Sequence, residues 1–184
     1  MDKRKSLDLI VLLMISVFVI SASAAIYYSL PMVSSTTITA TVVAFKGGAD
    51  WDTSSWTMGT NNTYCSLALK AYPNATLTYE EPLNLTNTGT GVDIRLRTVS
   101  INPASGNEQV SNFTFINFTL YDETGTFKGS LNYTTTGNDW STPTMGFTAM
   151  DASDEWYIVI QTKAEAGAKS GIVANIVIGV DVQE

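Results

Sequence analysis

The sequence predicts an all-β protein, an antiparallel jelly-roll/Ig-like β-sandwich. Three observations carry this prediction. Apolar and polar residues alternate with a period of about two, turn residues recur roughly every ten positions, and Ser and Thr together supply 42 of the 184 residues. Alternation buries one face of a strand, and β-branched Thr favours strand conformation. A chain with a single Cys lacks the paired cysteines of a true immunoglobulin domain.

Residues 1–24 are predicted to form a cleaved signal peptide. A basic cluster at residues 3–5 precedes Leu9–Ile20, a twelve-residue stretch that is apolar except for Ser16, and small residues follow. This order matches the charged region, apolar region and cleavage site of an export signal. The predicted cut lies between Ala24 and Ala25.

Two alternative interpretations of the N-terminus remain. The weakly polar stretch Leu9–Leu30 has 22 residues, which is long enough to be retained as a membrane anchor. A pilin-type signal is the other alternative, although no Gly or Ala directly follows the basic cluster.

The segment Ala25–Phe45 contains no Asp, Glu, Lys, Arg or Gly. Left unpaired, such a stretch exposes aromatic and β-branched side chains together with open main-chain groups. In one interpretation it is the first strand of its own domain. In the other, Pro31 helps to separate residues 25–35, a donor strand added to a neighbour's sheet, from the domain's own strand at residues 36–45. Donation of this kind is head-to-tail and builds a filament. The candidate donor residues are Ala25, Ile26, Tyr27, Tyr28, Leu30, Met32 and Val33.

Residues 36–184 are predicted to form the β-sandwich domain. The expected strands cover residues 36–45, 76–85 with an interruption at Pro82, 92–96, 113–121, 126–133, 156–161 and 172–182. The apolar residues of the fourth of these strands change from odd to even positions between Phe115 and Ile116, which indicates a β-bulge. The turn sequence at residues 122–125 predicts that residues 126–133 return as a hairpin partner.

The last two strands show the clearest alternation. Trp156, Ile158 and Ile160 share one parity, and the apolar residues of the final strand do the same from Ile172 to Val182. The link between these strands contains Gly167 and Gly171. It is predicted to close a hairpin.

Two polar stretches, residues 47–63 and 134–144, are expected to be long loops. They carry Trp51, Trp56 and Trp140. Exposed indole rings could form a platform on which sugars stack, whereas indoles that cover the ends of the core would be structural. Both interpretations stay open at this point.

Six Asn-x-Ser/Thr sequons are candidate N-glycosylation sites. They begin at Asn61, Asn74, Asn84, Asn112, Asn117 and Asn132. Several of these Asn residues alternate with apolar neighbours, as Asn84 does between Leu83 and Leu85. If the apolar side chains point inward, the Asn side chains point outward, where glycans would leave the core undisturbed.

The composition excludes many kinds of active site. The chain has no His, so a Ser–His–Asp triad and a His-based zinc site are absent. The lone Cys65 is expected to be buried and inert. A net charge of −7 argues against nucleic acid as a partner.

Acidic residues are the remaining acid–base groups. They cluster at turns or strand ends as Glu80-Glu81, Asp122-Glu123 and the group Asp151, Asp154 and Glu155. Solvated turn acids are the favoured interpretation, and a calcium site in the last group is the alternative. No catalytic residue, cofactor or metal site is predicted, and an enzyme is not expected.

Three patches of the sequence share the layout of a known family. The signal is followed by an aromatic-containing extended segment and TITATVVAF, residues 37–45. Residues 71–101, AYPNATLTYEEPLNLTNTGTGVDIRLRTVSI, contain the unit Asn87-Thr88-Gly89. Residues 151–184, DASDEWYIVIQTKAEAGAKSGIVANIVIGVDVQE, hold the alternating segment that begins at Trp156 and the long last strand.

This layout resembles the TasA/camelysin family of secreted fibre proteins and the related archaeal bundling pili and threads. The resemblance covers about half of the mature chain. It implies a jelly-roll-like sandwich that polymerises by donating its mature N-terminal strand. The camelysin branch is described as a metalloprotease, but that activity does not carry over to a chain without His and without a zinc motif.

The sequence therefore predicts a secreted, N-glycosylated subunit of an extracellular filament at the cell surface, a pilus or biofilm fibre used for adhesion, bundling or cell–cell association. Its partners would be further copies of itself and covalent N-glycans, with membrane contact only through an uncleaved signal segment. One alternative is a monomeric carbohydrate-binding module that uses the loop Trp residues. Another is an envelope glycoprotein anchored through Leu9–Leu30.

Overall fold

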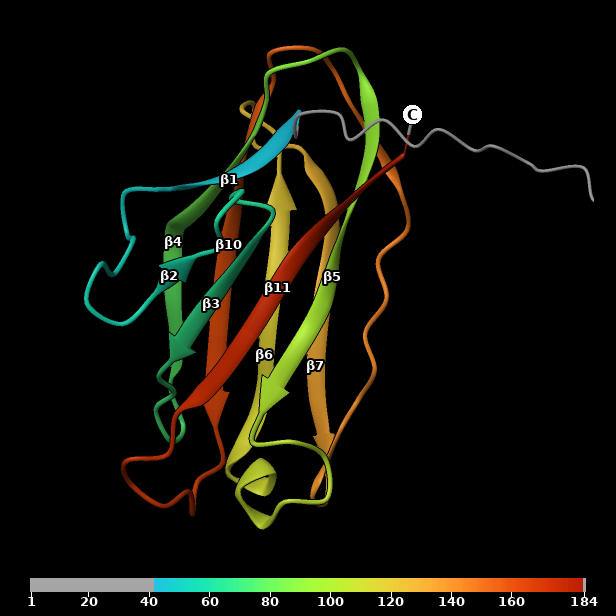
Figure 1. Ribbon diagram of the computed structural model, residues 1–184. Helices are drawn as coiled ribbons and strands as arrows, with labels where there is room; N and C mark the ends of the chain where they lie inside the picture. The colour runs from blue at the N-terminus through green and yellow to red at the C-terminus, as the bar shows by residue number, and fades with distance from the viewer. Residues whose placement is uncertain (1–41, 184) are drawn as a thin grey trace, which may run out of the picture. The chain divides into compact units, whose positions relative to one another are not determined.

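The computed structural model describes residues 42–183. In this range the chain is all-β, and two antiparallel sheets pack face to face as a sandwich (Figure 1). The predicted signal peptide, the cleavage site at Ala24 and Ala25, and the candidate donor segment 25–35 lie outside the described residues.

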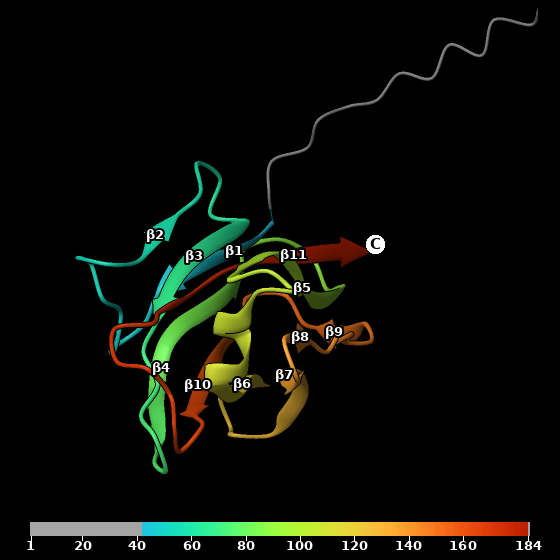
Figure 2. The same cartoon turned by 90° about the horizontal axis from the view of Figure 1, so that it is seen from below.

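The two sheets contain six and five strands. The six-stranded sheet has the order β1 (Val43–Gly47), β4 (Thr76–Asn87), β10 (Glu155–Ala164), β6 (Phe113–Tyr121), β7 (Phe127–Thr136) and β8 (Asp139–Trp140). The five-stranded sheet has the order β2 (Thr57–Met58), β3 (Tyr64–Leu69), β11 (Ala174–Gln183), β5 (Val92–Asn102) and β9 (Thr148–Met150). A short 3₁₀ helix, η1 (Glu108–Asn112), precedes β6. Figure 2 shows the two layers from below.

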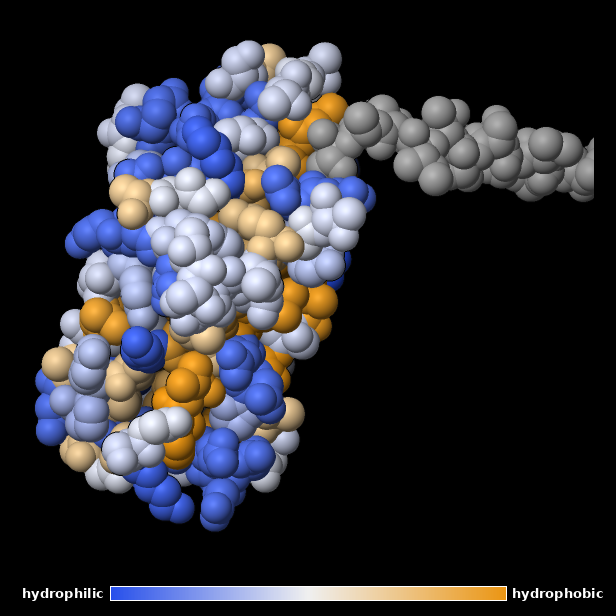
Figure 3. Space-filling model, turned by 60° about the vertical axis from the view of Figure 1, so that its left-hand side comes forward, coloured by the Kyte–Doolittle hydropathy of each residue, from blue (hydrophilic) through white to orange (hydrophobic). Residues whose placement is uncertain are grey.

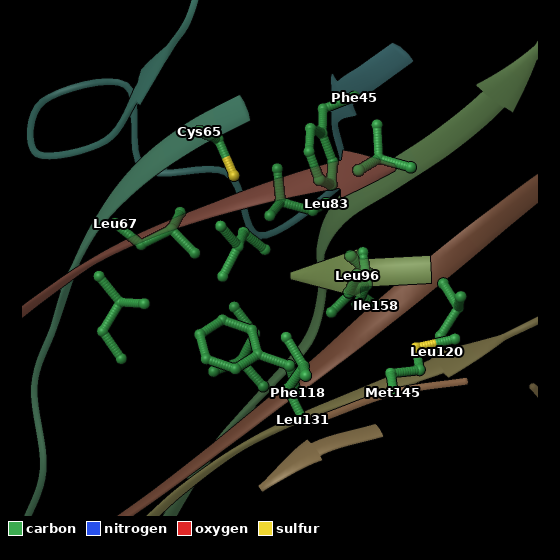
Figure 4. Packing of buried hydrophobic residues seen from close by; sticks show 14 of the residues in the cluster. Phe45, Cys65, Leu67, Leu83, Leu96, Phe118, Leu120, Leu131, Met145 and Ile158 are labelled. Carbon is green, nitrogen blue, oxygen red and sulfur yellow. The ribbon is translucent and has the colours of Figure 1, made fainter. Parts of the chain in front are cut away.

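The core fills the space between the sheets. On the central strand β10, alternate residues from Trp156 to Ala164 are buried. Trp156, Ile158 and Ile160 belong to one core cluster with apolar residues of β3, β5 and β11, and Figure 4 shows part of this cluster. Fully burying one Leu or Ile side chain contributes about 1.5–3 kcal/mol. The alternation predicted for residues 156–161 and 92–96 is confirmed.

The predicted bulge and hairpin in the middle of the chain are also confirmed. Along β6, Phe115 pairs with Lys163 but Phe113 pairs with Ala164, so Thr114 is the extra residue. This residue shifts the buried parity from Phe113 to Ile116. β7 pairs with β6 from Phe127 to Thr134, and the connecting turn contains Gly125 at a φ of +81°. That left-handed conformation suits glycine.

Pro82 interrupts the pairing of β4 without ending the strand. The register joins Leu83 to Ile158 and Tyr79 to Ile160, so three residues of β4 lie opposite Val159 alone. A proline cannot donate a ladder hydrogen bond, and a bulge removes the need for one. The predicted interruption is therefore a bulge inside one twelve-residue strand.

The hairpin predicted between the last two strands is wrong. β10 belongs to the six-stranded sheet and β11 to the five-stranded sheet, so the link 165–173 crosses from one layer to the other. Both strands still turn their apolar faces toward the space between the sheets. Alternation and glycines in the link are consistent with either connection, so they did not distinguish between them. The final strand also starts at Ala174 rather than Ile172, and Val182 is 39% exposed.

Candidate functional site

Three sequon asparagines are plainly exposed. Asn61 and Asn74 lie in turns, and Asn132 lies on the outer face of β7. Asn74 has a φ of +59° at the tip of the turn before β4, a conformation that Asn tolerates better than most residues. These three positions leave room for a glycan.

Asn112 and Asn117 are half-buried, and their amide groups form hydrogen bonds. Asn112 Nδ2 donates to the Gln109 carbonyl oxygen at 3.0 Å, and Asn117 Nδ2 donates to Thr119 Oγ1 at 3.0 Å. An N-linked glycan replaces only one hydrogen of Nδ2, so the other hydrogen stays available for such a bond.

Asn84 points outward as expected, but it is only 8% exposed. The loop after β1 covers it, because Gly48 N donates to the Pro82 carbonyl oxygen at 3.1 Å and Asp50 N donates to the Glu81 carbonyl oxygen at 3.0 Å. Asn84 Nδ2 donates to Glu81 Oε1 at 3.0 Å and Glu155 Oε1 at 3.1 Å. Strand parity correctly predicted the direction of this side chain, but the accessibility inferred from it is wrong.

Two sequons face each other on the outer face of the six-stranded sheet. Asn117 of β6 and Asn132 of β7 are cross-strand partners, and Gln161 of β10 is the partner of Asn117 on its other side. Together with Thr114, Phe115 and Thr134 these residues line a shallow hollow. Side chains at directly opposed positions lie about 5 Å apart at Cβ, so glycans on both residues would lie side by side.

The loop tryptophans do not form an exposed platform. Trp56 and Trp140 are 3% and 7% exposed. Trp56 Nε1 donates to the Ala68 carbonyl oxygen at 3.0 Å, and Trp140 Nε1 donates to the Pro103 carbonyl oxygen at 2.8 Å. Trp51 is half-buried and packs edge-on against Trp56 at 5.6 Å. The structural interpretation is therefore confirmed for Trp56 and Trp140, and the stacking platform built from them is wrong.

A different aromatic group lies on the outer face of the six-stranded sheet. The rings of Tyr121 and Tyr157 stack at 5.5 Å between centroids, and Phe127, which is 59% exposed, packs edge-on against Tyr121 at 6.3 Å. Sequence reasoning missed this cluster. The available signal was parity, since Tyr157 lies between the inward-facing Trp156 and Ile158. On the side of the molecule seen in Figure 3, hydrophobic residues form small patches among hydrophilic ones.

Asp122 organises the turn between β6 and β7. Its Oδ1 accepts hydrogen bonds from Thr124 Oγ1 at 2.6 Å, Thr124 N at 2.9 Å and Thr126 N at 2.8 Å. Its Oδ2 lies 3.1 Å from Lys128 Nζ. These donors, with the Thr124 hydroxyl first, hold the pKa of Asp122 well below its usual range. The carboxylate is structural.

The other acidic residues form surface contacts. Asp50 Oδ2 accepts from Glu80 N at 2.8 Å, and Asp154 Oδ2 accepts from Asp151 N at 3.0 Å. The amide of Asn84 and then the ammonium of Lys46 lower the pKa of Glu155. Between residues 42 and 183, no group of three or more acidic or Cys side chains is placed to hold a metal ion.

Cys65 is fully buried on β3, and burial raises the pKa of its thiol. The prediction that it is buried is confirmed. Since the thiolate is the reactive form, burial and the raised pKa both disfavour reactions of this thiol in the folded protein.

On the outer face of the five-stranded sheet, Asp181 binds two arginines. Arg95 Nε lies 3.0 Å from Asp181 Oδ2, and Arg97 Nε lies 2.6 Å from Asp181 Oδ1. These ion pairs join β5 to β11.

In the described part of the chain, no helix is long and apolar enough to cross a membrane. No protein-family model matches the chain, and no curated protein shows significant similarity to it.

Proposed function

We propose that this protein is a secreted structural subunit of an extracellular filament, with residues 25–35 acting as a donor strand that joins the sheet of the next subunit. In this proposal residues 1–24 are removed as a signal peptide, and residues 36–184 form a jelly-roll-like sandwich. The filament would serve adhesion, bundling or cell–cell association.

One observation carries the proposal. Ala25–Phe45 contains no charged residue, and the sandwich described from residue 42 onward has a buried core of its own, which includes Val43 and Phe45. A long uncharged segment in front of a sandwich with its own core fits a strand that is used between subunits. The resemblance to the TasA/camelysin fibre proteins supports the same function.

The surface of the sandwich is compatible with an extracellular role. The chain carries a net charge of −7, which favours solubility of an exported subunit. Five of the six sequon asparagines have exposed or half-buried side chains, and only Asn84 is covered. Glycans at those five positions would extend from loops and outer strand faces without entering the core.

Electron microscopy of the mature protein with and without residues 25–35 tests this function. The proposal predicts filaments from the complete mature chain, and a soluble, cooperatively melting monomer from the shortened one. Filaments from the shortened chain would refute strand donation. N-terminal sequencing of the mature protein separates this proposal from an anchored envelope glycoprotein, because an anchored protein keeps Leu9–Leu30.

A second candidate function is carbohydrate binding by the Tyr121, Tyr157 and Phe127 cluster. Adjacent aromatic rings on a flat sheet face suit stacking on sugar rings. Substituting Tyr157→Ala would then remove binding to a saccharide array, while Tyr64→Ala, at an exposed Tyr on the other sheet, would leave it intact. Equal binding by both variants would reject this function.

A further inference from the structure

The sandwich has two incompletely paired strands on the same side. In the part of the chain that the structure describes, β7 has a partner beyond β6 only at Thr135 and Thr136. β5 has a partner beyond β11 only at Val92, Asp93 and Ile94. β5 and β7 belong to different sheets but contact each other (Figures 1 and 2). The hydroxyl groups of Thr98 and Tyr133 form a hydrogen bond between them. The open parts of these two edges form a seam between the sheets.

Residues 141–147 cover this seam without forming a strand. Met145 inserts its side chain into the core and is 7% exposed. It packs against Gly129 of β7, where an added Cβ would lie 3.1 Å from Met145 Cγ. Phe147 lies 41% exposed beneath Arg95, whose guanidinium carbon is 4.5 Å from the ring centroid.

This covering segment has few main-chain contacts. At its start, Ser141 N donates to the Thr134 carbonyl oxygen at 2.8 Å, and Thr134 N donates to Ser141 Oγ at 2.9 Å. From residue 142 to 147, no main-chain hydrogen bond joins the segment to another residue within 42–183. Segments with few hydrogen bonds and one apolar anchor open most readily.

The edge beneath the segment offers main-chain groups to a strand. Because Thr134 directs its N–H and C=O toward Ser141, residues of the same parity, Asn132 and Ser130, direct theirs toward the same open side. Ser141 Oγ already donates to the Asn132 carbonyl oxygen at 3.3 Å. An incoming strand along β7 would find partners over residues 127–134.

We propose that this seam is the acceptor site for residues 25–35 of a second copy of the chain, and that Met145 holds the site until that strand displaces residues 141–147. The inference rests on the proposed filament function and locates the site within it. Displacing residues 141–147 removes one apolar side chain, that of Met145, from the core, and the donor strand brings several apolar side chains in its place.

The donor segment suits this site in charge, pattern and length. It has no charged side chain, and Ile26, Tyr28, Leu30 and Met32 share one parity, so one face of an extended strand would be apolar. Its eleven residues exceed the eight residues of β7 from 127 to 134. Pro31 has no N–H to donate, so it fits at a position of the donor strand whose main-chain groups point away from β7.

A second copy is a better donor than the same chain. β1 lies at the opposite edge of the six-stranded sheet from β7 and β8. A donor beyond β7 would be five strand spacings from β1, about 24 Å at roughly 4.8 Å each. From residue 35 to Val43 there are eight residue steps, which span at most about 26–29 Å when fully extended, so little length is left to pass around the end of the sandwich.

A reversible disulfide tests the seam directly. The double variant Gly129→Cys/Met145→Cys joins two positions in direct contact, because an added Cβ at Gly129 would lie 3.1 Å from Met145 Cγ, and a disulfide forms between Cβ atoms about 3.5–4.5 Å apart. When oxidised, the bond would hold residues 141–147 over the seam. We expect the oxidised mature chain to remain monomeric and the same sample to form filaments after reduction, while each single variant forms filaments under both conditions.

The outcome distinguishes the seam from the filament function. If the oxidised double variant forms filaments while the chain without residues 25–35 does not, donation occurs at another site and the seam proposal is overturned. If the oxidised double variant and the chain without residues 25–35 both form filaments, the hypothesis of strand donation is refuted.

Amide hydrogen exchange of the unmodified chain gives an independent check if the double variant does not fold. In filaments, the Ser130 and Asn132 amides should exchange at least about tenfold more slowly than in the monomer without residues 25–35, since a donor strand protects them. Equal exchange in the two samples would contradict the proposal.

Discussion

At the residue scale, Asp122 makes the stability contributed by the β6–β7 turn depend on pH. Its folded pKa is depressed by the Thr124 hydroxyl, main-chain N–H groups and Lys128. A depressed pKa adds stability that is present above the unfolded pKa of about 3.9 and is lost as the pH falls toward the folded value. Glu155, whose pKa is also lowered, contributes with the same sign.

We therefore expect Asp122→Asn to melt at a lower temperature than the unmodified protein at pH 7, with a difference that shrinks as the pH falls below about 4. Thermal melts across this pH range measure the effect. Glu123→Gln removes a charge from the same exposed turn without touching these contacts, so it is the control and should follow the unmodified protein. A constant difference between Asp122→Asn and the unmodified protein at every pH would contradict the assignment.

Accessibility separates two sequons that look alike in the sequence. Asn132 is exposed on β7, whereas Asn84 is covered by the loop after β1 and hydrogen-bonded to Glu81 and Glu155. In protein from its native host, Asn132→Gln should lower the intact mass by one glycan, and Asn84→Gln should leave the glycan mass unchanged. Loss of a glycan from the Asn84→Gln variant would show that this asparagine is modified before the loop closes over it.

At the scale of elements, the central strand β10 shows how parity controls stability. Ile158 is fully buried, and its neighbour Val159 is half-buried on the opposite face of the sheet. Ile158→Ala should lower the free energy of unfolding by about 2–5 kcal/mol, because it removes buried methyl groups and leaves a cavity. Val159→Ala should lower it by less than about 1 kcal/mol. Denaturant titration of both variants measures the difference, and similar losses would show that the strand faces are wrongly assigned.

Most of the long strands could be predicted from the sequence because burial on one face leaves a period-two pattern, but β3 was missed although its buried residues also alternate. The bulge near Phe115 could be predicted for the same reason, and the turn at residues 122–125 could be predicted from its turn residues. The sequence did not predict to which of the two sheets each strand belongs. β10 and β11 carry the same pattern whether they form a hairpin or lie in opposite layers, and that choice depends on packing between distant strands.

The sequence also did not show which side chains are covered by distant segments of the chain. Asn84 has the parity of a surface residue, and only the loop 48–50 makes it inaccessible. Trp56 and Trp140 lie in polar stretches, yet their indoles reach carbonyl oxygens of Ala68 and Pro103. The short helix η1, which buries Val110, has no periodic signal at five residues. The candidate surface aromatics were likewise found only once the strands were aligned.

At the scale of the whole molecule, the sandwich described from residue 42 to 183 combines a buried core with two incompletely paired strands on one side. Its buried cluster runs from Val43 to Val180, so a monomer lacking residues 25–35 should stay folded. Its seam between β5 and β7 is covered by a segment without strand pairing. In the proposal, such a molecule stays monomeric until residues 25–35 of a second copy add to this seam.

The most direct test of strand donation is filament length in mixtures of the complete mature chain with the chain lacking residues 25–35. In the proposed filament, the shortened chain would accept a strand without donating one, so each copy would end a filament. The account predicts that mean filament length, measured by electron microscopy, falls steadily as the fraction of shortened chain rises, while the shortened chain alone remains monomeric. Filaments whose length is independent of that fraction, or that contain the shortened chain throughout, would contradict it.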